Sequence, residues 1–326
     1  MTSHDVVARV RRLAGTRRVG HAGTLDPMAT GVLLVGVEKA TRLLGYLSLT
    51  EKEYAATIRL GQSTTTDDAE GDPSGGASAA GVSPETLSSE VAKLTGQIMQ
   101  IPPGVSAIKV GGQRAYKLTR AGAAPELAAR RVTVYEFAVT DVRQAGEFLD
   151  LDGTIRCSSG TYIRALARDL GAALGTGGHL TALRRTSVGP YTIAQARTLD
   201  HLSERLVVTP LAEAAAAAFP RVDLTASDAR RLSQGARIPA PPPHAAPASD
   251  SAPAAPASES APAAPASESA HALSAAASQP TPTLTSGADE APLAAFAPDG
   301  TLVALVTVKA GRLVSLAVFA EPSSVG

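Results

Sequence analysis

The sequence predicts an α+β fold with two domains. Strand-like and helix-like patterns follow one another irregularly, without the strand–helix–strand rhythm of a doubly wound sheet. At 326 residues the chain is long enough for about two domains, and its 44% hydrophobic content is enough to bury a core. Residues 1–215 are predicted to form the larger domain. Residues 216–326 are predicted to form a small β-rich module, interrupted by an insert at about 239–292.

The first half of the chain is predicted from caps and side-chain periodicity. Ser3 can cap a helix whose apolar residues recur every three or four positions, and Gly15 ends that helix. The alternation in KEYAATIRL indicates a strand over residues 52–60. The other elements expected here are a loop at 16–30, a buried strand at 31–37, a helix at 39–47 and a loop at 67–80.

The second half is predicted in the same way. Ser83 followed by Pro84 opens a helix that ends at Gly96. Two strand patterns joined by a short turn predict an antiparallel pair, and an amphipathic helix follows. The expected ranges are strands at 131–142 and 147–157, a helix at 162–174, and β-rich segments at 219–238 and 293–318.

The predicted insert differs in composition from the rest of the chain. It contains 12 of the 23 prolines, two tandem copies of SAPAAPASE, and no Lys or Arg. Such a segment has too few large apolar side chains to offset the entropy of ordering it, so a linker is expected. The whole chain has a formal charge of zero, but without the five acids of the insert it carries 30 bases against 25 acids. The predicted folded part is therefore basic.

Composition and motifs exclude several classes of protein. A single cysteine rules out a disulfide scaffold and a cysteine-based zinc site. The six histidines show no metal-ligand spacing, and no P-loop or GxGxxG is present. No apolar run approaches the length of about 18 residues that a membrane span needs, and no signal peptide is recognised. We therefore expect no metal, no cofactor, no membrane contact and a cytoplasmic location.

The segment RRVGHAGTLDPMATG at 17–31 carries the first candidate site. Asp26 stands between a glycine-containing turn and a proline, beside the predicted buried strand. Arg17, Arg18 and His21 lie within ten residues of it, which suits a phosphodiester substrate. From this segment alone, an ordinary Asp-Pro turn is also a valid reading.

Two basic, acid-poor segments carry the second candidate site. Arg164 and Arg168 are four residues apart and share a face of the predicted helix at 162–174, although a solvated charged face is the usual explanation. Further basic residues accompany the aromatic residues Tyr116 and Tyr162, as a groove for RNA backbone and unstacked bases requires. The candidates for RNA-backbone contact are Arg17, Arg18, Lys109, Arg114, Arg184 and Arg185.

Taken together, these segments resemble the bacterial tRNA pseudouridine-55 synthases, the TruB type related to eukaryotic dyskerin. Five blocks carry the resemblance in order, and their joint match is far more specific than any one of them. The blocks are residues 2–7, 20–33 (GHAGTLDPMATGVL), 52–54 with 60–61 and 64–71, 100–116 (QIPPGVSAIKVGGQRAY), and 159–169 with 183–189 (LRRTSVG).

The resemblance implies a role for each site residue. Asp26 would be the catalytic aspartate, as a nucleophile or by removing a sugar proton, and Arg164 would pair with it. The substrate-binding residues would be Tyr54, stacked on a flipped uracil, Tyr162, supporting the site, His21, near the vacated base, and Leu183, in the pocket wall. Plain core packing stays open for Tyr54, Tyr162 and Leu183, and a loop hydrogen bond for His21. The reaction needs no cofactor, because one base is rejoined to its sugar through another atom.

The resemblance also implies a fold and a partner. The larger domain would have a mixed, mainly antiparallel central sheet with flanking helices, and the C-terminal module would be PUA-like and hold RNA. The substrate would be uridine 55 in the T stem-loop of tRNA, flipped out of its stack by a monomeric enzyme. Family members usually begin with a strand that ends in Asp-Lys-Pro, whereas Met1 stands directly before Thr2 here. We expect the start codon to lie further upstream, because a missing strand would expose a sheet edge.

Two other functions stay open from the sequence. The protein could be a catalytically idle tRNA-binding protein or tRNA-folding chaperone that keeps the same groove, although binding alone does not require a carboxylate beside phosphates. It could also be a carboxylate-based glycoside hydrolase. Hydrolysis usually needs a second carboxylate about 5–9 Å from the first, and the blocks around Asp26 offer an arginine instead.

Overall fold

The computed structural model describes residues 1–105, 109–110, 113–114, 127–241 and 291–321. The chain divides into two compact units, Met1–Arg221 and Val222–Gly326. The boundary predicted from the sequence stood at residue 215. Most of the predicted insert, residues 242–290, lies outside the described residues.

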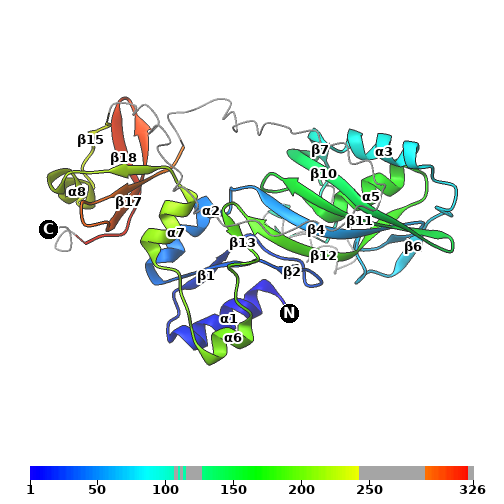
Figure 1. The fold of residues 1–326 in the computed structure, drawn as a ribbon, viewed down its shortest axis with the longest axis horizontal. Helices are drawn as coiled ribbons and strands as arrows, with labels where there is room; N and C mark the ends of the chain where they lie inside the picture. Colours follow the sequence, from blue (N-terminus) through cyan, green and yellow to red (C-terminus); the bar gives the residue numbers. More distant parts are fainter. Residues whose placement is uncertain (106–108, 111–112, 115–126, 242–290, 322–326) are drawn as a thin grey trace, which may run out of the picture. The chain divides into compact units, whose positions relative to one another are not determined.

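A seven-stranded sheet forms the centre of the first unit (Figure 1). Its main path is β13 (Tyr191–Thr192), β12 (Gly178–Val188), β4 (Lys52–Leu60), β11 (Phe148–Cys157), β10 (Arg130–Ala145) and β7 (Gly96–Gln100). These neighbours are antiparallel, and β2 (Thr30–Gly31) pairs with β12 in parallel. The expectation of a mixed, mainly antiparallel sheet is confirmed.

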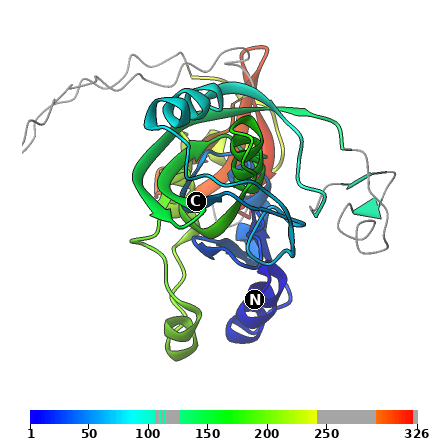
Figure 2. The same ribbon diagram turned by 90° about the vertical axis from the view of Figure 1, so that its right-hand side faces the viewer.

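The core lies between this sheet and its helices. Every second residue of β4 is buried, as the alternation predicted, and the inward row contains Tyr54 and Ile58. Helix α5 (Ile163–Ala173) packs Leu166 and Leu170 into the same cluster, and α3 (Pro84–Lys93) adds Leu87. In Figures 1 and 2 the cyan α3 and the blue α1 (Ser3–Ala14) lie at opposite ends of the first unit.

Helix α1 begins one residue earlier than predicted. Thr2, not Ser3, is its N-cap: the Thr2 hydroxyl accepts from the Asp5 backbone N–H, and the Asp5 carboxylate accepts from the Thr2 N–H. This reciprocal capping box satisfies two donors that a helix end leaves free. Gly15 ends the helix in the left-handed conformation, as expected. The Ser3 side chain is therefore available for a contact elsewhere.

The prediction of one continuous strand at 31–37 is wrong. The strand is interrupted at Val32, whose N–H donates to the Arg185 carbonyl, and β2 and β3 (Leu34–Val37) belong to different sheets. Strand β3 pairs with β1 (Val19–Ala22). The helix expected at 39–47 is likewise split, into a 3₁₀ turn η1 (Glu38–Arg42) and the short α2 (Leu44–Leu47).

Several shorter elements complete the first unit. Helix α3 ends at Lys93, three residues before the predicted end, because Gly96 already starts β7. The strand pair around residue 146 is confirmed as β10 and β11. The remaining elements are β5 (Ser63–Thr64), β6 (Pro73–Gly75), β8 (Lys109–Val110), β9 (Gln113–Arg114), α6 (Leu199–Glu204) and α7 (Leu211–Ala218).

The second unit is a small five-stranded sheet with one helix, and the pairs β16–β17, β17–β18 and β15–β18 are antiparallel. Its strand order is β14 (Arg221–Asp223), β16 (Leu293–Phe296), β17 (Leu302–Lys309), β18 (Arg312–Val318) and β15 (Ile238–Pro239), and the helix is α8 (Ala226–Ser233). Leu232 of α8 packs against Val303 and Leu313. Strands from both sides of the insert join one sheet, so the predicted β-rich module is confirmed. Among the residues described, no helix is both long and apolar enough to cross a membrane.

Candidate active site

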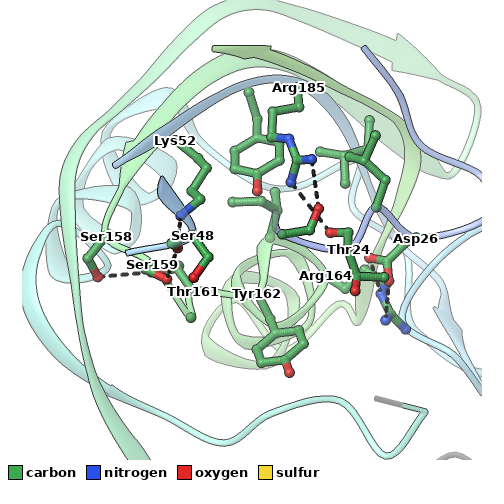
Figure 3. Close-up of a pocket in the computed structure, with 16 residues that line it drawn as sticks. Thr24, Asp26, Ser48, Lys52, Ser158, Ser159, Thr161, Tyr162, Arg164 and Arg185 are labelled. Carbon is green, nitrogen blue, oxygen red and sulfur yellow. Dashed lines mark hydrogen bonds and ion pairs between the residues drawn. The ribbon is translucent and has the colours of Figure 1, made fainter. Parts of the chain in front are cut away.

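One cavity of the first unit brings together four segments that lie far apart in the sequence. It has a volume of about 260 Å³ and is shown in Figure 3. The loop before β2 contributes Asp26, β4 contributes Tyr54, the start of α5 contributes Arg164, and β12 contributes Leu183. With Tyr162 and Arg185, which also line it, the structure places six of the predicted site residues around one cavity.

Asp26 and Arg164 form a bidentate ion pair. Arg164 Nη2 lies 2.8 Å from Asp26 Oδ1, and Arg164 Nε lies 3.0 Å from Asp26 Oδ2. The Arg164 side chain is only 4% exposed, whereas the Asp26 side chain is 29% exposed and lines the cavity. A planar guanidinium that binds both oxygens fixes the carboxylate in orientation as well as in position.

Arg164 itself is held by three further groups. Its Nη1 donates to the Thr66 carbonyl at 2.9 Å, its Nη2 donates to the Val105 carbonyl at 3.0 Å, and its Nε lies 3.5 Å from the buried Asp68 carboxylate. Helix α5 carries the arginine in its first turn. The side chain thus joins four segments of the fold and presents one face to Asp26.

Arg185 fixes the backbone of the loop that carries Asp26. Its Nε donates to the Val32 carbonyl at 2.7 Å, its Nη2 to the Gly23 carbonyl at 3.0 Å, and its Nη1 to the Thr24 carbonyl at 3.4 Å. Arg185 is 1% exposed. The predicted contact of Arg185 with RNA phosphate does not fit this placement, because its guanidinium is buried and directed at carbonyls inside the fold.

Ser3 holds the same loop from the other side. Its hydroxyl accepts from the Leu25 N–H at 3.0 Å and lies 3.3 Å from the Leu25 carbonyl. Ser3 is 4% exposed. Contacts at Gly23, Thr24, Leu25 and Val32 therefore flank Asp26 on both sides, so the carboxylate stands on a preorganised loop.

Gly31 makes the close approach of this loop to β12 possible. Its φ is +100°, and a Cβ there would lie 2.1 Å from the Arg185 carbonyl oxygen. We expect Gly31→Ala to lower the free energy of unfolding by about 1–3 kcal/mol, through strain and overpacking, and to reduce activity as the Asp26 loop shifts. Urea denaturation measures the first effect. Gly45→Ala is the matched control, because nothing lies within 4 Å of a Cβ there; an equal loss in both variants would contradict this account.

Tyr54 and Leu183 form part of the cavity wall. They are 9% and 6% exposed, and they come from the neighbouring strands β4 and β12. Burial raises the pKa of the Tyr54 phenol, so its hydroxyl stays protonated at neutral pH. An aromatic ring beside an aliphatic side chain is a surface that suits a flat base.

Tyr162 stands at the start of α5 and also lines the cavity. The Gln100 side chain accepts from its backbone N–H at 2.8 Å and donates to its carbonyl at 3.1 Å. Gln100 is 1% exposed. The loop that leads into α5 is therefore anchored to the end of β7, a contact that no local pattern predicts.

His21 lies on β1 and is not among the described residues that line the cavity. Its ring contacts the edge of the His4 ring with centroids 5.6 Å apart. Burial lowers the pKa of His21, so its imidazole is neutral at pH 7. Its Nδ1 is buried without a hydrogen-bond partner among the residues described.

Lys52 lines the cavity and was not a sequence candidate. It is 5% exposed, and its ammonium donates to the carbonyls of Ser48, at 2.6 Å, and Thr50. Burial, reinforced by the nearby Arg185 charge, lowers the pKa of Lys52 to about 8. The sequence pattern could have identified Lys52 as a site candidate, because it occupies an inward position of an alternating strand whose other inward residues are all uncharged.

The other basic candidates lie elsewhere. Arg17, Arg18 and Arg184 are exposed; Arg184 Nη1 lies 3.3 Å from the Thr30 hydroxyl, and Arg18 lies 3.7 Å from Glu38. Lys109 and Arg114 face each other in the β8–β9 pair, whose side chains lie outside the description. Tyr116 also falls outside the described residues. Within the described ranges, no three His, Cys, Asp or Glu residues come together as a metal site would require.

Comparison with solved structures identifies the fold. An H/ACA ribonucleoprotein bound to a substrate RNA containing 2′-deoxyuridine superposes with a TM-score of 0.64 at 20% identity, covering 100% of this chain and 84% of that chain. A Cbf5–Nop10–Gar1 complex matches with a TM-score of 0.64 at 23% identity, covering 99% and 83%. Together with the match of residues 11–163 to the model of the TruB family pseudouridylate synthases, this fold defines an enzyme of the pseudouridine synthase class, an isomerase.

Sequence comparison then gives the family. The model of the TruB family pseudouridylate synthase N-terminal domain matches residues 11–163, and that of the tRNA pseudouridylate synthase B C-terminal domain matches residues 164–216. The chain belongs to the TruB family. The tRNA pseudouridine synthase B of Thermobifida fusca is 64% identical over 256 residues, covering 77% of this chain and 87% of that protein. The protein of the same name from Arthrobacter sp. is 52% identical over 321 residues, covering 98% and 93%.

Proposed function

We propose that this protein converts uridine 55 in the T loop of tRNA into pseudouridine, acting as a cytoplasmic monomer without a cofactor. The Asp26–Arg164 pair in the cavity is the observation that carries the proposal. The relatives named tRNA pseudouridine synthase B support tRNA as the substrate. The predicted basic character of the folded part supports an RNA partner in general.

The cavity suits a single flipped nucleotide. C5 and the glycosidic bond of a uridine are inaccessible inside a stacked loop, so the base must leave its stack to react. In the proposed complex Tyr54 stacks on the uracil and Leu183 contacts its edge, while Asp26 faces the ribose. Tyr162 supports the far side of the cavity, and His21 stands outside it, toward the space that the flipped base vacates.

The reaction balances without any co-reactant. The bond between C1′ and N1 breaks, a bond between C1′ and C5 forms, the C5 proton leaves, and N1 gains a proton. Asp26 acts in the cleavage, as a nucleophile or as a base toward the sugar. We assign RNA-backbone contacts to Arg17, Arg18, Lys109, Arg114 and Arg184, because charges outside the cavity can hold phosphates without entering the chemistry.

The test is pseudouridine mapping on defined RNA. Purified protein is incubated with a tRNA transcript, with its isolated T stem-loop, and with the same transcript carrying cytidine at position 55. Mass spectrometry is expected to find one pseudouridine, at position 55, in the first two RNAs and none in the third. Binding without any pseudouridine would support the idle tRNA-binding protein instead. Light scattering of the protein–RNA complex tests the monomer.

A further inference from the structure

Two buried cations stand in the wall of the cavity without a carboxylate partner. Lys52 and Arg185 are 5% and 1% exposed, and both line the cavity. Their hydrogen-bond partners are main-chain carbonyls and, for Arg185, also the Tyr54 hydroxyl, and within the described part of the chain neither forms an ion pair. Burying a charge without a counter-charge is costly, and such groups gather at functional sites.

Among the residues that the structure describes, the surroundings of Lys52 supply no compensating anion. Arg185 of β12 adds a second positive charge. Cys157 of β11, the register partner of Lys52, has a thiol whose pKa is raised by burial to about 11. Tyr54, two residues along β4 on the same face, is held protonated by burial. The carboxylate that lines the same cavity is Asp26, and it is bound by Arg164. The wall around Lys52 is therefore positively charged.

The ammonium also keeps one donor without an acceptor among the described residues. A lysine ammonium has three N–H groups, and the two acceptors that the structure gives Lys52 are the Ser48 and Thr50 carbonyls. Ser48 also lines the cavity, and its carbonyl accepts from Ser159 as well. Figure 3 shows Lys52 and Arg185 along one side of the cavity, with the Asp26–Arg164 pair at another.

We propose that Lys52, backed by Arg185, is a catalytic residue that stabilises the negative charge that develops on the flipped uracil when its glycosidic bond breaks. The inference rests on the proposed function. The electron pair of the C1′–N1 bond stays with the base, which becomes an anion delocalised over N1, O2, C5 and O4. The charge is neutralised again when C5 bonds to C1′, the C5 proton leaves and N1 is protonated. Preorganised positive charge in a buried site is worth far more for this step than in water.

The decisive variant is Lys52→Met, which keeps an unbranched side chain only one atom shorter and removes its charge. We expect the single-turnover rate constant for pseudouridine formation to fall about 100-fold, as for loss of one electrostatic stabiliser. The Kd for the T stem-loop stays unchanged, because the charge matters in the transition state and not in the bound ground state. Lys93→Met is the matched control: Lys93 is an exposed lysine of α3, paired with Glu90, and its loss leaves the rate unchanged.

The pH profile separates charge from packing. The pKa of Lys52 is about 8, so its charge is present below this pH and lost above it. The kcat/KM of the wild type, which reports ionisations of the free enzyme, is expected to fall as pH rises through about 8. The Lys52→Arg variant stays charged throughout, so its kcat/KM should not show this alkaline decline. The kcat/KM of Lys52→Met should be low at every pH and should not show the decline either. Ionisation of the RNA affects all three proteins equally.

The outcomes are distinguishable. A wild-type protein that forms no pseudouridine refutes the proposed function. An active wild type whose Lys52→Met variant keeps the full rate, or shows the same alkaline decline, overturns only the role of Lys52. Thermal unfolding of each variant shows whether the fold persists. If Lys52→Met does not fold, a wild-type kcat/KM that shows no decline between pH 7 and pH 9 overturns the inference on its own.

Discussion

Asp26→Asn is expected to lower the rate of pseudouridine formation about 10⁴-fold or more, the size of effect seen when a central catalytic group is removed. Asparagine has nearly the same shape but no negative charge, so it can neither attack C1′ nor accept a sugar proton. The loop itself should persist, because Arg185 and Ser3 hold its backbone and not the Asp26 side chain. The RNA should therefore still bind.

Single-turnover assays with mass-spectrometric detection measure this loss, and filter binding measures the Kd for the same RNA. Asp200→Asn is the matched control: it makes the same chemical change at a side chain that is 87% exposed and paired only at the surface with Arg9. Activity within a few-fold of wild type in Asp26→Asn would remove Asp26 from the chemistry. Loss of RNA binding in Asp26→Asn would instead show that the carboxylate serves the complex and not the reaction.

The sequence predicted the parts of the site that depend on local pattern or on the family resemblance. The alternation over 52–60 correctly predicted the strand β4, whose inward row contains Tyr54. The Asp26–Arg164 pairing was expected from the resemblance alone, because the two residues are 138 positions apart and no spacing rule joins them. The contact forms because α5 and the Asp26 loop meet at the same cavity, which only the assembled sheet determines.

Two adjacent arginines differ in burial in a way that was not predicted from the sequence. Arg184 and Arg185 look equivalent in LRRTSVG, yet one is exposed and the other is 1% exposed. In a strand, residues two apart share a face. Leu183, expected in the cavity wall, therefore already placed Arg185 inward, provided that a strand was recognised there. Strand β12 shifts register near Leu180 and again after Arg185, and such bulges blur the alternation that identifies a strand.

Other errors came from competition between nearby groups. Thr2 and Ser3 are both good caps, and the choice depends on Asp5, which reaches the Thr2 N–H. The apolar run at 31–37 reads as one strand, but Gly31 with a φ of +100° lets the chain turn close to Arg185 and breaks it. In both cases a tertiary contact with the Asp26 loop accompanies the deviation: Ser3 binds Leu25, and Arg185 binds Val32. These two departures from local pattern lie beside the site, as expected where function constrains the backbone.

Arg164→Met is expected to reduce both activity and stability, because Arg164 serves two carboxylates. Without it, Asp26 loses its bidentate partner, and Asp68, whose side chain is 3% exposed, keeps a charge without its cation. Removing one partner of a buried ion pair costs about 3–5 kcal/mol. The carbonyls of Thr66 and Val105 lose donors as well. Chemical denaturation should show the destabilisation, and the rate should fall about 10³-fold as the carboxylate loses its fixed orientation.

The double variant Arg164→Met/Asp68→Asn separates the two roles. Neutralising Asp68 removes the uncompensated buried charge, so stability should recover in part, while Asp26 still lacks its partner and the rate stays low. Arg168→Met is the control on the next turn of α5: Arg168 is 28% exposed and pairs with Asp67 and Asp169, so its loss costs less stability and spares the chemistry. A rate that recovers together with stability in the double variant would mean that Arg164 serves the fold alone. A rate that stays low in a restored fold requires that the guanidinium acts on Asp26 directly, because within the described part of the chain the other contacts of Arg164 go to Thr66, Val105 and Asp68.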